Sequence, residues 1–184
     1  MKKKVVLLGD SIRQWGYGTR VPEMLGEEYE VWQPNDNCRF VKYTLRGLFD
    51  WKDAIADANV IHWNNGLWDC TDIFDDGLFT SEEEYVENML RVAKHLLRVT
   101  PDVIFATTTP VLDAFEWTHN DKIDRFNEII VPRLEALGIK INDLNTMVKQ
   151  DVERYIRASD KIHLSDEGVE VCAEQVVRAI KAFD

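Results

Sequence analysis

Short apolar runs alternate along the chain with longer segments in which apolar residues recur at helical spacing. Runs rich in aliphatic, β-branched and aromatic residues at 5–8, 29–32, 60–63 and 103–107 predict strands, because each ends close to a glycine, proline or asparagine turn. The shorter run 139–141 predicts a weaker fifth strand. Strands that are mostly apolar on both faces are typical of a parallel sheet covered on both sides.

Three further segments predict helices. Ser81 and Glu84 form a capping box, and apolar residues then recur every three or four positions until Pro101. The segments 121–137 and 165–183 show the same spacing, and Gly138 ends the first of them. Strands alternating with helices indicate an α/β fold with a central parallel sheet of about five strands. For 184 residues, 45% of them hydrophobic, we expect one domain spanning 1–184.

Polar residues follow the carboxyl end of each of the first four runs, where open parallel sheets bind their ligands. Two long segments, 64–80 and 108–120, are predicted to be loops, and loops of that length are often functional. The polar groups that follow the four runs are Gly9-Asp10-Ser11, Asn35-Asp36-Asn37-Cys38, Asn64-Asn65-Gly66 and Thr107-Thr108-Thr109-Pro110.

The net charge and the N-terminal residues limit the kinds of partner and the location that we expect for the protein. A formal net charge of -11 repels phosphate backbones and anionic lipid surfaces, so we expect neither nucleic acid nor a membrane as a partner. The basic run at 2–4 is followed by only four apolar residues, too few for a signal peptide, and no segment has transmembrane length. We therefore expect a cytoplasmic protein.

Cofactor motifs are missing from the sequence. The cysteines Cys38, Cys70 and Cys172 are odd in number and lack C-x-x-C or Cys/His ligand spacing, which argues against disulfides and zinc. Neither G-x-G-x-x-G nor G-x-x-x-x-G-K-[ST] occurs, and Asp10 has no second acid beside it to hold magnesium for phosphotransfer. We expect no cofactor and no metal.

Ser11 and the segment Asp160-Lys161-Ile162-His163 form the strongest catalytic candidate. A serine at a strand-to-helix turn lies near free N–H groups, and a carboxylate three residues before a histidine can orient the imidazole that accepts the serine proton. Each residue also has a structural interpretation. Ser11 alone is more commonly a helix cap, and Asp160 and His163 could be loop residues that precede the Ser165 cap.

Other polar and aromatic residues fall near the predicted site. Asn64 or Asn65, with main-chain N–H groups of Ser11 and of the loop near Cys38, could stabilise an oxyanion, although Asn-Asn-Gly is also a common turn. His62, His95 and His119 are interpreted as structural. The tryptophans at loops or strand ends either contact a substrate or only pack; they are Trp15, Trp63, Trp68 and Trp117.

The ordered blocks of this chain resemble the GDSL-type, or SGNH, hydrolases. Gly9-Asp10-Ser11-Ile12, an asparagine after the third strand, and Asp160-x-x-His163 stand in the family's order and span nearly the whole chain. The resemblance implies a flavodoxin-like three-layer α/β/α sandwich. It also implies a catalytic triad with Ser11 as nucleophile and with Asp160 and His163 completing it.

Two blocks depart from the family pattern. The family places a glycine, whose N–H lines the oxyanion hole, where this chain has Cys38 or, as the second choice, Asn37. The usual Gly-x-Asn-Asp block reads Asn64-Asn65-Gly66 here, which leaves the asparagine that donates to the oxyanion ambiguous. We favour Asn64, with Asn65 as the alternative.

The function implied is a serine esterase that cleaves carboxylic esters through an acyl-enzyme. We expect a small-acyl esterase, such as a carbohydrate O-acetylesterase, whose partner is a small ester, for example an acetylated carbohydrate. The alternatives are a lysophospholipase or thioesterase type of acyl hydrolase, and a non-catalytic flavodoxin-like module that binds a ligand at the same edge of the sheet.

Overall fold

A five-stranded parallel sheet forms the centre of the computed structural model, which describes residues 2–184. Its strand order, β2-β1-β3-β4-β5, matches the flavodoxin-like prediction. The direction of strand addition reverses between β1 and β3, so the residues after these two strands border the crevice where open α/β sheets bind ligands. The strands are β1 (Lys3–Leu8), β2 (Tyr29–Trp32), β3 (Val60–Trp63), β4 (Val103–Ala106) and β5 (Lys140–Asn142).

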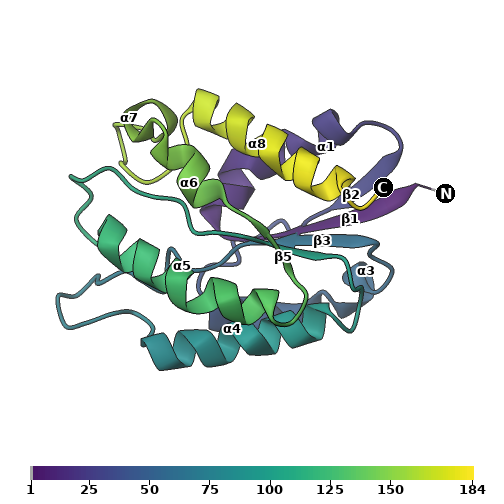
Figure 1. The fold of residues 1–184 in the computed structure, drawn as a ribbon, viewed down its shortest axis with the longest axis horizontal. Coiled ribbons are helices and arrows are strands. Elements are labelled where there is room, and N and C mark those ends of the chain that lie inside the picture. Colours follow the sequence, from purple (N-terminus) through teal and green to yellow (C-terminus); the bar gives the residue numbers. More distant parts are fainter. Residues whose placement is uncertain (1) are drawn as a thin grey trace.

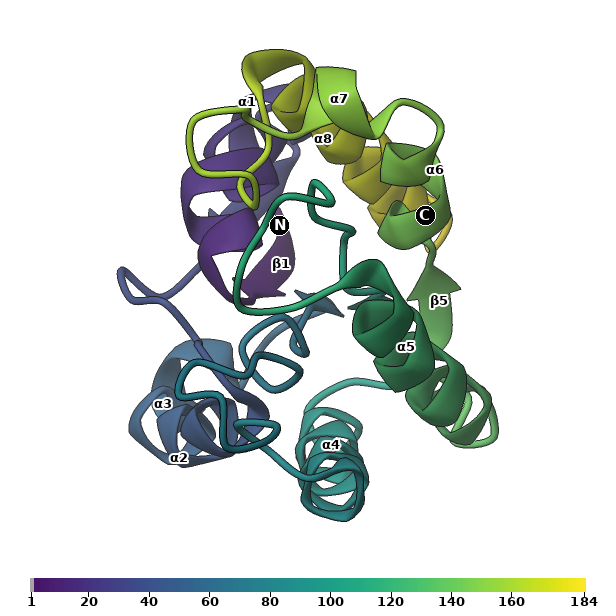
Figure 2. The ribbon, with the colours of Figure 1, turned by 90° about the vertical axis from the view of Figure 1, so that its left-hand side faces the viewer.

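Helices cover both faces of the sheet, which gives the three layers that were predicted (Figure 1). One layer contains α1 (Val21–Leu25), α6 (Leu144–Lys149), α7 (Val152–Tyr155) and α8 (Asp166–Lys181). The other contains α2 (Val41–Asp50), α3 (Lys52–Ile55), α4 (Glu82–Leu96) and α5 (Asn120–Glu135). Figure 2 shows the two layers on opposite sides of the strands.

The burial of the strands explains their composition. Every residue of β3 and β4 is buried, as are the last four residues of β1, because helices pack on both faces. One hydrophobic cluster joins these strands to the inner faces of α4, α5 and α8. The expected strands agree with the observed ones to within two residues at each end.

Side-chain caps fix the starts of two of the predicted helices. The Ser81 hydroxyl accepts a hydrogen bond from the Glu84 N–H at 3.2 Å, and the Ser165 hydroxyl accepts one from the Gly168 N–H at 3.1 Å. Each satisfies a main-chain donor that the first turn of a helix leaves unpaired. Because Ser165 starts α8 in this way, the loop just before it, which carries His163, is held at a defined end of the helix.

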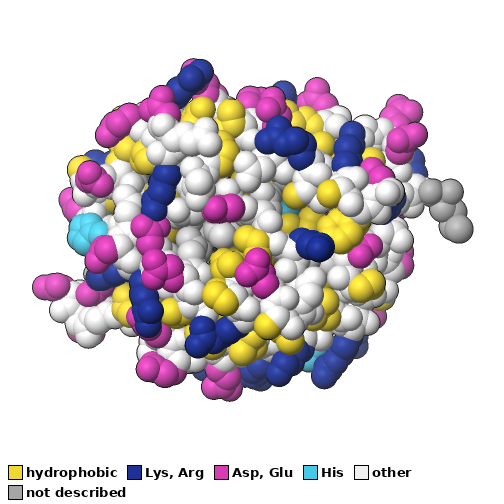
Figure 3. Space-filling view, in the orientation of Figure 1, with side chains coloured by type: hydrophobic (Ala, Val, Ile, Leu, Met, Phe, Trp, Pro, Cys, Tyr) yellow, Lys and Arg dark blue, Asp and Glu magenta, His cyan; other side chains and the backbone are white. Residues whose placement is uncertain are grey.

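The surface mixes charges of both signs. On the face shown in Figure 3, lysine and arginine side chains are interspersed with aspartate and glutamate. Within residues 2–184, no helix is long and apolar enough to cross a lipid bilayer. That the chain has no nucleic-acid or membrane partner stays a prediction.

Candidate active site

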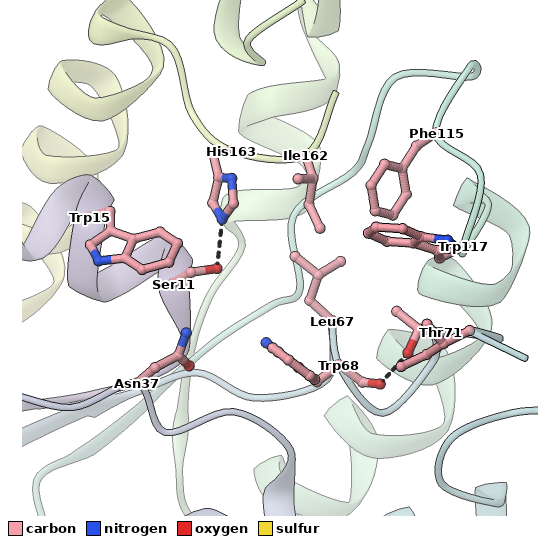
Figure 4. Close-up of a pocket in the computed structure, with 11 residues that line it drawn as sticks. Ser11, Trp15, Asn37, Leu67, Trp68, Thr71, Phe115, Trp117, Ile162 and His163 are labelled. Carbon is pink, nitrogen blue, oxygen red and sulfur yellow. Dashed lines mark hydrogen bonds between the residues drawn. The ribbon is translucent and has the colours of Figure 1, made fainter. Parts of the chain in front are cut away.

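Ser11, His163 and Asp160 lie in a continuous hydrogen-bonded row at the carboxyl end of the sheet. Ser11 follows β1 at the start of a π-helical turn (Ile12–Gly16), while the other two residues lie in the loop between α7 and α8. The Ser11 Oγ is 2.9 Å from His163 Nε2 (Figure 4). His163 Nδ1 is 3.1 Å from Asp160 Oδ2. The fold therefore brings together three residues that are up to 152 positions apart in sequence.

The Asp160 carboxylate is held by its own loop. Its Oδ1 accepts hydrogen bonds from the His163 N–H at 2.9 Å and the Ile162 N–H at 3.1 Å. Partial burial opposes ionisation, but these main-chain bonds and the His163 ring outweigh it and lower the pKa of Asp160. Lys161, at φ 65°, makes the tight turn that allows the carboxylate to fold back onto the ring. Asp160 is thus an ionised acceptor for His163 Nδ1.

The turn that presents Ser11 depends on Gly9. A Cβ at Gly9 would lie 1.9 Å from the Asn64 Oδ1, so only glycine allows β1 to pass this close to the residue that follows β3. Asp10 Oδ1 accepts a hydrogen bond from the Ile12 N–H at 2.9 Å. Burial raises the pKa of Asp10, while the Asn64 amide and the Ile12 N–H oppose the increase. Asp10 therefore stabilises the turn that presents Ser11.

Arg13 joins the serine turn to the loop after β2, a role that was not predicted from the sequence. Its side chain is 1% exposed, and its guanidinium donates to the main-chain oxygens of Gly9, Pro34 and Asp36 at 2.5 to 3.3 Å. An arginine is rarely buried unless its donors are satisfied in this way. Only its position two residues after the serine could have drawn attention to it.

The two asparagines after β3 have different surroundings. Asn64 Oδ1 accepts a hydrogen bond from the buried Tyr17 hydroxyl at 2.8 Å, and its amide lies beside Asp10. Asn65 is fully buried, and its Oδ1 accepts from the Thr44 hydroxyl and the Trp63 indole while its Nδ2 donates to a main-chain oxygen. Asn65 therefore has its polar groups engaged in the core, whereas Asn64 remains the candidate donor.

The main-chain N–H of Cys38, which was expected to line the oxyanion hole, is not free to do so. Its N–H donates to the Gly9 oxygen at 3.0 Å, and its Sγ accepts from the Gly9 N–H at 3.2 Å, so the expected main-chain oxyanion donor is already paired. Burial raises the pKa of the Cys38 thiol to about 11, and its side chain is 0% exposed. The residue joins two loops and is a poor nucleophile.

A cavity of about 260 Å³ opens beside Ser11 and His163. Trp15, Trp68 and Trp117 border it, as expected, and the Trp15 ring lies 5.2 Å from the His163 ring. Trp63 does not, because its side chain is fully buried on β3 and packs against Phe105. Asn37, the second choice for the main-chain oxyanion donor, also borders the cavity (Figure 4). The other wall residues, most of them apolar, were not predicted: Leu67, Thr71, Ile73, Phe115 and Ile162.

His62 belongs to the core of the sheet and not to this site. His62 is fully buried in β3, and burial lowers its pKa to about 3, so it is a neutral core residue. Within residues 2–184, no group of three or more His, Cys, Asp and Glu side chains is placed to hold a metal ion.

Comparisons of the sequence with known proteins identify relatives over nearly the whole chain. GDSL esterase/lipase WDL1 of Oryza sativa subsp. japonica is 30% identical, covering 96% of this chain and 76% of the relative. GDSL esterase/lipase CPRD49 of Arabidopsis thaliana is 26% identical, covering 98% of this chain and 79% of the relative. No family model matches the sequence.

Solved structures share the fold. A lipase/acylhydrolase from Enterococcus faecalis superposes with a TM-score of 0.80 at 20% identity, covering 98% of this chain and 96% of the other. An acetyl xylan esterase, AlAXEase, also gives 0.80 at 20% identity, covering 96% of this chain and 99% of the other. Together with the sequence relatives, these similarities establish that the chain belongs to the GDSL esterase/lipase family of ester hydrolases.

Proposed function

We propose that the chain hydrolyses small carboxylic esters through an acyl-enzyme on Ser11. The observation that carries this proposal is the hydrogen-bonded row from Ser11 Oγ through His163 to Asp160, with distances of 2.9 and 3.1 Å. Ser11 Oγ attacks the ester carbonyl while its proton passes to His163 Nε2. The bond to the alcohol breaks, and the alcohol leaves with that proton. Water then attacks the acyl group and gives a proton to Nε2. That proton passes to Ser11 Oγ as the bond between Oγ and the acyl carbon breaks, which releases the acid and regenerates the Ser11 hydroxyl.

The acyl group is small, and the alcohol is a carbohydrate or similar polar molecule. The cavity of about 260 Å³ is smaller than ordinary ligand pockets of roughly 300–1,000 Å³, which favours a short acyl chain over a lipid tail. Trp15 and Trp117 are 57% and 50% exposed at its edge, where flat ring faces can pack on a sugar. A structural neighbour is an acetyl xylan esterase, which supports the same substrate class.

The alternative substrate is a longer acyl ester or thioester. Leu67, Phe115 and Ile162 make the wall largely apolar, which suits an acyl chain. A series of p-nitrophenyl esters from acetate to octanoate, with acetylated xylo-oligosaccharides and a lysophospholipid, separates the two. We expect the highest kcat/KM with acetyl esters. Octanoate or lysophospholipid as the best substrate would reassign the enzyme to the longer-chain class.

The exposed Trp15 ring at the edge of the cavity allows a test of the proposed carbohydrate substrate. Trp15→Ala removes one exposed ring face, which is worth about 0.5–1.5 kcal/mol, or roughly twofold to tenfold in kcat/KM for an acetylated xylo-oligosaccharide. The loss on p-nitrophenyl acetate should be smaller. Phe49→Ala is the matched control, because Phe49 is 67% exposed on α2 and does not border this cavity. Equal losses on both substrates would argue against sugar stacking at Trp15.

Asn64 and Asn65 make a matched pair for the oxyanion hole. We expect Asn64→Ala to lower kcat by about 10²–10³ with KM little changed, because an amide donor acts mainly on the charge that develops in the transition state. Asn65→Ala should instead lower the free energy of unfolding by about 1–3 kcal/mol, since it leaves buried partners unpaired. Steady-state kinetics with thermal unfolding checks both variants. The reverse pattern would make Asn65 the donor.

A further inference from the structure

We propose that the side-chain amide of Asn37 donates a hydrogen bond to the oxyanion that forms on the substrate at Ser11. This inference rests on the proposed acyl-enzyme mechanism and adds a catalytic residue to it. It assigns to an asparagine side chain the position in which a main-chain N–H of the same loop was expected. Asn37 borders the cavity together with Ser11 and His163, and it comes from the loop between β2 and α2.

The hydrogen bonds of the loop fix which way the Asn37 amide faces. Its Oδ1 accepts a hydrogen bond from the Arg39 N–H at 2.8 Å. Because a main-chain N–H can only donate, the amide atom that faces the Arg39 N–H must be the oxygen. The other terminal atom of the amide is therefore Nδ2. In Figure 4 the amide nitrogen of Asn37 lies on the side of Ser11. Within residues 2–184 the Asn37 Nδ2 has no hydrogen-bond partner, and it is directed toward the serine.

The main-chain donors of residues 37–39 are already used. The Asn37 N–H donates to Asp36 Oδ1 at 2.8 Å, the Cys38 N–H donates to the Gly9 oxygen at 3.0 Å, and the Arg39 N–H donates to Asn37 itself. None of these three groups can meet a new acceptor without breaking a bond. Among the main-chain and amide donors of residues 37–39, the Asn37 Nδ2 is the one left without a partner in the part of the chain that the structure describes.

The loop is anchored firmly enough for this amide to be in place before the reaction. The Arg13 guanidinium donates to the Pro34 and Asp36 oxygens, and the Tyr43 hydroxyl donates to Asp36 Oδ2 at 2.5 Å. Cys38 pairs in both directions with Gly9, two residues before Ser11. A donor fixed in advance stabilises developing charge without a cost of reorganisation during the reaction. The anchoring therefore favours a catalytic role over a purely structural one.

The test is the isosteric variant Asn37→Asp together with Asn37→Ala. The aspartate can still accept from the Arg39 N–H, so the loop keeps its bond, but it replaces the donor by a carboxylate oxygen. We expect both variants to lower kcat by about 10²–10³ with KM little changed. Thermal unfolding should be normal for Asn37→Asp, whereas Asn37→Ala should unfold at a lower temperature because the Arg39 N–H loses its acceptor. The affinity for a trifluoromethyl ketone, which forms a tetrahedral adduct, should fall in parallel. Asn35→Asp and Asn35→Ala are the controls, because Asn35 is exposed in the same loop, and we expect normal kcat for both.

The outcomes separate this inference from the proposed function. If Ser11→Ala is inactive while both Asn37 variants keep kcat and ketone affinity within about threefold, the assignment of Asn37 is wrong and the mechanism stands. If Ser11→Ala keeps full activity, the acyl-enzyme mechanism itself fails. A loss confined to thermal stability in both Asn37 variants would also overturn the inference, because it would show that the amide only holds the loop.

Discussion

Replacing Ser11 by alanine is expected to lower kcat for p-nitrophenyl acetate by roughly four to six orders of magnitude. The Ser11 Oγ is the atom that would form the acyl bond, and within residues 2–184 no other hydroxyl is hydrogen-bonded to the His163 ring. The fold should tolerate the change, since the variant loses a single hydrogen bond worth about 1 kcal/mol. Steady-state kinetics and thermal unfolding on the same preparation measure both quantities.

Ser81→Ala is the matched control for that experiment. The Ser81 hydroxyl caps α4 by accepting from the Glu84 N–H, away from the cavity. Its removal should lower the free energy of unfolding by about 1 kcal/mol while leaving kcat unchanged. A Ser11→Ala enzyme that kept kcat within tenfold of the original would contradict the mechanism.

His163→Ala should reduce kcat to nearly the same residual level as Ser11→Ala, and the double variant should be no slower than either single variant. The serine is nucleophilic only while the imidazole accepts its proton, so removing either group removes one shared function. Groups that act as a unit show this lack of additivity. Measured kcat values for the three variants make the comparison. His95→Ala, on the exposed face of α4, should behave as the original enzyme.

Additive losses would lead to a different conclusion. If the double variant lost the product of the two single effects, Ser11 and His163 would act in independent steps, and the hydrogen bond between them would not be the basis of catalysis.

Local patterns predicted the strands and the three longest helices, but not the ten-residue helix α2. Buried strands must be apolar, so β1, β3 and β4 were visible as runs, and the caps at Ser81 and Ser165 marked helix starts. Helices such as α1, α3 and α7 were not predicted, because four or five residues are too few to show a helical period. Their stability comes from packing between distant segments.

Only the site residues that lie in a recognisable short sequence pattern could be predicted. The Asp160-x-x-His163 spacing reports a tight turn, which the structure contains, whereas hydrogen bonds between loops leave no such pattern. The pairing of the Cys38 N–H with Gly9 depends on how β1 passes the following loop. Trp63 was assigned to the site because it ends a strand, but its alternation along β3 directs it into the core.

The most direct test of the central claim is covalent labelling with a serine-directed organophosphonate followed by tryptic mass spectrometry. The tryptic peptide 5–13 contains Ser11 as its single hydroxyl residue, so a phosphonyl mass on that peptide identifies the atom without ambiguity. We predict one phosphonyl group per chain on this peptide, loss of esterase activity in proportion to labelling, and no label on Ser11→Ala. Stoichiometric labelling of a peptide with Ser81, Ser159 or Ser165, or inactivation without label on 5–13, would contradict the assignment of Ser11 as the nucleophile.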